Sequence, residues 1–205
     1  MKIHVRHPIR AMIDDSYFFL SSLIKRFPSL LNDWMAEQEQ EVGTFAKEFS
    51  EGDPEVYLST YQSQIQRIDP CYYEIELFNQ SMLIMTYSYY ESTIYRFAKE
   101  TESDNRPSCI AEKEGSSLDE VSLKVSSYLF DTIRPLRNEL CHNNNGTLFI
   151  EATESEKSNI LALVRKGILS INDEKIIISD SSFILQTLEI EHKLLCNLAD
   201  ICGYK

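Results

Sequence analysis

Apolar residues recur at three- and four-residue spacing along this chain of 205 residues, and this period restricts its fold more than any other feature. The pattern is clearest between residues 10 and 49, at Ile13, Tyr17, Leu20, Leu23, Ile24, Phe27, Leu30, Leu31, Trp34 and Met35. Such spacing places apolar side chains on one stripe of an α-helix, which is buried against another element. We therefore predict one long helix or two shorter ones, with Pro28 as a kink or a break.

Later segments continue the helical period. It predicts helices over about 54–69, 73–100, 118–142, 154–166 and 182–202. Polar residues over 101–118 predict a loop, and the runs 168–171 and 175–178 predict a small hairpin. The predicted fold class is all-α, a helical bundle with a small peripheral β-hairpin, in which residues 1–70 form an N-terminal helical layer packed on a core of residues 71–205.

Composition favours a globular protein of the cytoplasm. A hydrophobic content of 43% is enough for one substantial core. No apolar run approaches the roughly 20 residues that a membrane span needs, and the first residues lack the apolar region of a secretory signal. Five cysteines without a C-x-x-C pair predict reduced thiols rather than disulfides or a zinc ribbon.

The net charge of −12 argues against a protein that coats nucleic acid, because a strongly negative field repels a polyanion. An enzyme acting on nucleic acid needs only a local basic cleft, which Arg134, Arg137 and Arg96 could supply. An acidic surface also suits a basic protein partner.

Residues 137–142 (Arg-Asn-Glu-Leu-Cys-His) place a guanidinium, an amide and an imidazole near a predicted helix end. A guanidinium can hold a phosphate bidentately, and an imidazole can move the proton of a 2′-hydroxyl, so the segment suits RNA cleavage without a metal ion. Arg137 and His142 lie about 140° apart around a helix, which favours a site completed by a second copy of the chain. The alternative is that both side chains only cap carbonyls and pair with acidic neighbours.

Other polar residues give weaker signals. Glu91, on the predicted central helix, either faces solvent, pairs with a nearby Arg or Lys, or orients a residue of a cleft. Glu189, Glu191 and His192 share a helix without a second set of metal ligands, which predicts a solvated face. No Gly-rich phosphate loop is present, so we predict neither a metal nor a cofactor.

A helical bundle with R-N-x-x-x-H at a helix end, followed by a polar segment with Gly and a last helix, resembles the HEPN superfamily. The resemblance covers roughly residues 73–202, and its signature is Arg, four to six residues, then His, often with a polar residue such as Asn138 after the Arg. Some HEPN families carry E-x-x-x-K-R in the preceding helix. Residues 91–96 keep the Glu and the Arg of this pattern but have Tyr95 in place of the Lys.

The resemblance implies a metal-independent endoribonuclease whose site forms between two HEPN domains. Arg137 would hold the scissile phosphate, His142 would act as base or acid, and Asn138 would orient one of them. Support would come from Glu91, Arg96 and Arg134. Members act as toxins in toxin–antitoxin pairs and in phage defence, so the implied partners are RNA, a second copy and an antitoxin or regulatory protein. The alternative is a non-catalytic, HEPN-like dimeric module for binding or regulation.

Overall fold

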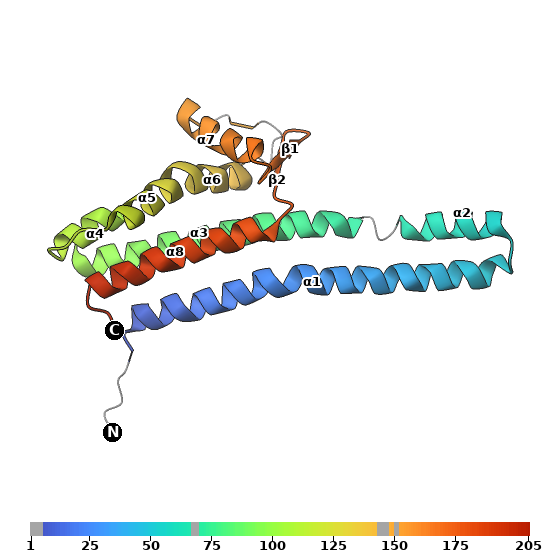
Figure 1. Ribbon diagram of the computed structural model, residues 1–205, viewed down its shortest axis with the longest axis horizontal. Helices are drawn as coiled ribbons and strands as arrows, with labels where there is room; N and C mark the ends of the chain where they lie inside the picture. Colours follow the sequence, from blue (N-terminus) through green and yellow to red (C-terminus); the bar gives the residue numbers. More distant parts are fainter. Residues whose placement is uncertain (1–5, 67–69, 143–147, 150–151) are drawn as a thin grey trace, which may run out of the picture.

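The chain folds as an all-α bundle with a two-stranded hairpin, the class that its apolar period predicts (Figure 1). The computed structural model describes residues 6–66, 70–142, 148–149 and 152–205. Its elements are α1 (Pro8–Ser50), α2 (Pro54–Ile65), α3 (Pro70–Thr101), α4 (Pro107–Lys113), α5 (Glu120–Tyr128), the π-helical turn η1 (Leu129–Ile133), α6 (Arg134–His142), α7 (Glu154–Arg165), β1 (Ser170–Asn172), β2 (Lys175–Ile177) and α8 (Ser181–Ile201). Among the described residues, no helix has both the length and the apolar character that crossing a bilayer requires.

Helix α3 lies at the centre of the bundle. It packs against α1, α4, α6 and α8, and Figure 1 shows α3 and α8 between α1 on one side and α5 and α6 on the other. Fully buried side chains from three elements meet here: Leu83, Phe97, Leu129, Ile133, Ile184 and Leu188. The central position predicted for this helix from its apolar residues agrees with this packing.

Helix α1 continues through Pro28 for 43 residues, so the break considered at this proline is absent. A proline inside a helix removes one backbone hydrogen bond. Tertiary packing offsets that loss, because Ile24 is buried one turn before Pro28 and the neighbouring Phe27 ring stacks on Phe78 of α3, with ring centroids 4.1 Å apart.

The outer part of α1 and α2 form a helical hairpin that extends beyond the bundle, which we call the arm (residues 31–65) (Figure 1). Asp53 caps α2 by accepting hydrogen bonds from the backbone N–H groups of Glu55 and Val56 at 2.9 and 3.3 Å, a role for which Asp is a preferred residue. The arm has a small apolar cluster of its own, in which Met35 packs with Leu31, Val42 and Ile65.

The predicted loop over 101–118 is wrong in part, because it contains α4. Pro107 occupies the first helical position, where the missing N–H costs nothing. Pro107, Ile110 and Ala111 are buried and attach α4 to α3 and α8. Three well-placed apolar residues therefore outweigh the polar composition of the segment.

The predicted hairpin is confirmed: β1 and β2 pair antiparallel, with Ser170 opposite Ile177. Side chains of α3 fix it to the bundle. Asn79 Nδ2 donates to the carbonyl of Ile178, and Gln80 Nε2 donates to that of Ile176, both at 2.8 Å.

Glu191 on α8 is fully buried, so the solvated face predicted for this region is wrong at this residue. Neither of its carboxyl oxygens has a hydrogen-bond partner among the described residues. Burial raises its pKa well above the ordinary value of 4.5, so the side chain is held as a neutral acid.

Glu191→Gln should remove a pH-dependent loss of stability. Above about pH 4.5 the unfolded chain releases the Glu191 proton while the native protein keeps it, so the free energy of unfolding falls by about 1.4 kcal/mol per pH unit until the folded pKa is reached. Urea unfolding of both proteins should show the free energy of unfolding of the variant increasing relative to that of the wild type as the pH rises above about 4.5. A stability difference that stays constant over this range would contradict a neutral buried Glu191.

Candidate functional site

Pro135 determines how the motif helix α6 begins. In a regular helix the residue at position 135 would donate to the carbonyl of Asp131, and proline has no N–H to do so. The helix widens into η1 instead, where the Arg134 N–H donates to Leu129, five residues back. Asn159 Nδ2 on α7 donates to the freed Asp131 carbonyl at 2.9 Å. The interruption that Pro135 causes is thus a π-helical turn that α7 supports.

Arg137 is held between α6 and α3. Its guanidinium forms an ion pair with the Glu91 carboxylate and lies over the Tyr87 ring, 5.3 Å from the ring centroid. The Arg137 side chain is 19% exposed, whereas that of Glu91 is 41% exposed. Of the interpretations of Glu91, the structure shows pairing with an arginine, and this arginine belongs to the motif.

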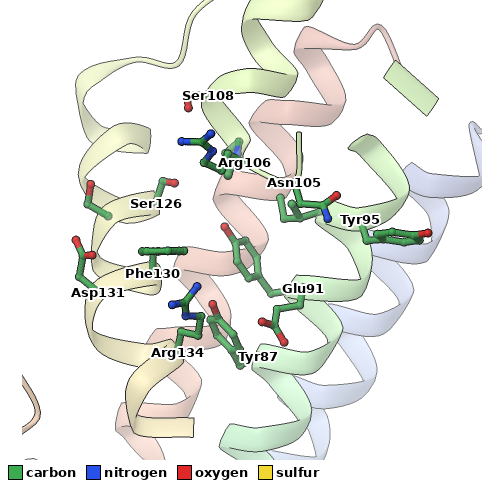
Figure 2. Close-up of a pocket in the computed structure, with 14 residues that line it drawn as sticks. Tyr87, Glu91, Tyr95, Asn105, Arg106, Ser108, Ser126, Phe130, Asp131 and Arg134 are labelled. Atoms are coloured by element: carbon green, nitrogen blue, oxygen red, sulfur yellow. The ribbon is translucent and has the colours of Figure 1, made fainter. Parts of the chain in front are cut away.

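A groove of about 650 Å³ lies beside this pair, between α3 and the helices α5 and η1 (Figure 2). Figure 2 shows Arg134 and Phe130 on one wall, facing Tyr87 and Glu91 on the other. The Arg134 guanidinium stacks on the Phe130 ring, with its carbon 3.9 Å from the centroid. Stacking of this kind fixes a guanidinium in place without neutralising it.

Arg134 and Arg137 differ in their electrostatic surroundings. Among the described residues no carboxylate lies within ion-pairing distance of Arg134, and its buried Nε has no hydrogen-bond partner. Arg137 already pairs with Glu91. At the far end of the groove Arg106 pairs with the exposed Asp104 at 3.4 Å. An anion entering the groove would therefore meet Arg134 without having to break an ion pair.

The structure does not bring His142 to Arg137 within one chain. His142 ends α6 and is exposed, while Asn138 is half-buried one turn earlier. Five positions along a helix separate two residues by about 7.5 Å in height and about 140° in direction. Arg137 points towards α3, so one chain alone does not place both side chains on one phosphate.

Arg96 does not join this group of residues. Its guanidinium lies 3.0 Å from Met12 Sδ on α1, and it is not among the residues that line the groove. Of the supporting residues expected from the sequence, the structure therefore places Glu91 and Arg134 beside Arg137 and Arg96 elsewhere.

Sequence reasoning missed the aromatic residues that hold the two arginines. Phe130 and Arg134 are four residues apart, a spacing that places side chains on one helical face and could have indicated their stacking. Tyr87 and Glu91 have the same spacing on α3. The face with Phe130 and Arg134 meets the face with Tyr87 and Glu91 because α6 packs on α3. A local sequence pattern does not show this packing.

Comparisons with protein-family models, with curated proteins and with solved structures found no match for this chain. The resemblance to the HEPN superfamily therefore rests on the motif residues and their helical setting.

Asn159→Ala should weaken the junction of α6 and α7. The substitution removes the donor to the Asp131 carbonyl and should lower the free energy of unfolding by about 0.5–1 kcal/mol. Ser158→Ala, at the exposed neighbouring position, is the matched control and should leave it unchanged. Chemical denaturation followed by circular dichroism measures both, and equal effects would show that η1 does not depend on α7.

Proposed function

We propose that this chain is a metal-independent endoribonuclease of the HEPN type that acts as a homodimer in the cytoplasm. The observation that supports it is the pair of motif-helix arginines, each held against an aromatic ring beside one groove. Glu91 and Asp131 also line the groove, but Glu91 is paired with Arg137. The Arg134 guanidinium has no ion-pair partner among the described residues and is therefore a local cation in a chain of net charge −12. The groove thus favours a specific anionic ligand such as an RNA strand.

Each side chain has a distinct role in the proposed reaction. Arg137 binds the scissile phosphate and stabilises the charge that develops on it, and Glu91 keeps the guanidinium in place when RNA is absent. His142 removes the proton of the 2′-hydroxyl, whose oxygen attacks phosphorus, and the same imidazole then gives this proton to the departing 5′-oxygen. The products are a 2′,3′-cyclic phosphate and a free 5′-hydroxyl. Asn138 orients His142 or the phosphate, and Arg134 holds the adjoining phosphate.

A dimer would complete the site. Because Arg137 faces α3 and His142 lies exposed at the end of α6, the imidazole that acts on a phosphate bound by Arg137 comes from the second copy. A two-fold interface contributed by α3 and by α5 and α6 presents both motifs to one cleft.

The arm suits the regulatory partner or antitoxin that a toxin or phage-defence protein requires. Its sequence holds eight acidic side chains and one lysine, and Phe45, Phe49 and Leu58 are about half exposed or more. A basic protein with apolar side chains matches this surface in charge and in polarity.

The second candidate function is a non-catalytic dimeric module for binding or regulation. The Glu91 carboxylate favours it, because this group neutralises the guanidinium that would hold the phosphate. In this case the groove binds an anion through Arg134 and no RNA is cleaved.

RNA cleavage should survive EDTA, leave a 2′,3′-cyclic phosphate and spare DNA, which lacks the attacking 2′-hydroxyl. His142→Ala should lower the cleavage rate by a factor of about 10²–10⁴, through the loss of acid–base catalysis. Arg137→Lys should also be strongly impaired, since an ammonium cannot form the bidentate contact. Arg26→Lys, on the exposed face of α1, is the matched control and should cleave like the wild type.

Gel analysis of a fluorescent single-stranded RNA pool measures the rates, and thermal melts show that the variants remain folded. If the wild-type protein leaves this RNA pool intact after any bound partner has been removed, the ribonuclease proposal is overturned and the binding module is favoured.

Mixing two inactive variants should restore activity if the site is shared between copies. A heterodimer of Arg137→Lys and His142→Ala has one site with both native side chains, so equal mixing with subunit exchange should recover about a quarter of the wild-type rate. Light scattering should show a dimer at micromolar concentration. A mixture that stays inactive despite exchange, or an active monomer, would contradict the shared site.

A further inference from the structure

Three side chains of metal-ligating type meet between α1 and α8, on elements that do not carry the motif. A carboxylate oxygen of Asp14, a ring nitrogen of His192 and Cys196 Sγ all lie within 4.8 Å of one another. The imidazole nitrogen is 3.2 Å from the Asp14 oxygen and 3.5 Å from the Cys196 sulfur. All three side chains are partly buried.

Local and tertiary structure both position these groups. His192 and Cys196 are four residues apart and therefore share one face of α8. The packing of α1 on α8 brings Asp14 to this face, although 178 residues separate it from His192. The Tyr17 ring stacks on the imidazole with centroids 4.1 Å apart, which fixes the direction of the ring.

Hydrogen bonds alone do not explain why Asp14 and Cys196 both lie close to His192 Nε2. Both Asp14 and Cys196 approach the same ring nitrogen, and a neutral imidazole nitrogen either carries one proton or offers one lone pair. If Nε2 carries the proton, the carboxylate accepts it and the sulfur has at best a share of it. If Nε2 is bare, the thiol can donate to it, but the carboxylate oxygen faces a second acceptor. Three donor atoms around one point are instead the geometry of ligands around a cation.

We propose that Asp14, His192 and Cys196 bind one zinc ion, with a fourth position open to water, and that this ion fastens α1 to α8. Zinc bond lengths to nitrogen, oxygen and sulfur predict tetrahedral separations of about 3.3 Å between N and O and about 3.6 Å between N and S. The separations of 3.2 and 3.5 Å match them. Thiolate and imidazole ligands select zinc over magnesium or calcium.

The surroundings of Asp14 orient its carboxylate for this role. Its Oδ2 atom is held by Arg6 at 3.1 Å and by Arg10 at 3.5 Å, which directs Oδ1 towards His192. Arg10 also pairs with Asp200 at 2.9 Å, so two aspartates balance the two arginines. Outer partners of this kind are typical of metal-binding carboxylates. The Cys196 thiol releases its proton to solvent when the ion binds.

The proposal is tested by measuring zinc binding to the purified chain after a chelator has removed any bound metal. Competition with a chromophoric zinc chelator should show one tight site per chain, and Co²⁺ in its place should give the thiolate-to-cobalt charge-transfer band. Cys196→Ser should abolish this band and weaken zinc binding at least about 100-fold, and His192→Gln and Asp14→Asn should weaken it similarly. Cys202→Ser, a half-buried cysteine that follows the same helix, is the matched control and should retain both properties.

Thermal melts provide a second measurement, because an ion that binds the native chain alone raises its melting temperature. Added zinc should raise it for the wild type and Cys202→Ser but not for Cys196→Ser. Wild-type protein that binds zinc no more tightly than Cys196→Ser would overturn the proposal and leave a hydrogen-bonded cluster. Tight binding that survives all three ligand substitutions would also overturn it. RNA cleavage is measured separately in EDTA, so failure of the ribonuclease proposal does not affect this result.

Discussion

The packing of α3 against α1, α6 and α8 is the contact on which the rest of the structure depends. Leu83 and Phe97 of this helix are fully buried, while Tyr87 and Glu91 meet Arg137 of α6. The core side chains fix the rotation of α3 about its axis, and the same rotation sets where the Glu91 carboxylate lies. One helix therefore forms both the centre of the core and one wall of the groove, so that a change of core volume near Tyr87 would also move the groups that hold the motif arginine.

Features that depend on neighbouring residues could be predicted from the sequence. The start of α2 follows from the cap that Asp53 provides and from Pro54, and the hairpin follows from two short β-branched runs around a polar turn. Features that depend on tertiary packing could not be predicted from the sequence. Pro28 interrupts a local pattern, but the burial of α1 against the bundle carries the helix through it. Likewise α4 forms because three of its apolar side chains are buried in the core, although the segment around them is polar.

The candidate site divides in the same way. The order of Arg137, Asn138 and His142 along one helix end is visible in the sequence, as is the spacing of His192 and Cys196. The residues that pair with them cannot be identified from the sequence, because Glu91 is 46 residues from Arg137 and Asp14 is 178 residues from His192. The burial of Glu191 likewise depends on tertiary packing and could not be predicted from the sequence around it. A carboxyl group indicates a polar helical face only while it is ionised, and complete burial keeps this one neutral.

Helix α1 takes part in two separate packing arrangements along its length. Its first half contributes Ile9, Ile13, Leu20 and Ile24 to the main core, whereas its outer half packs on α2 around the small cluster at Met35. The outer half can unwind without exposing the main core, so its local opening requires less free energy than global unfolding. The backbone amides of one continuous helix are consequently divided between two cooperative units, and hydrogen exchange along α1 reports the boundary between them.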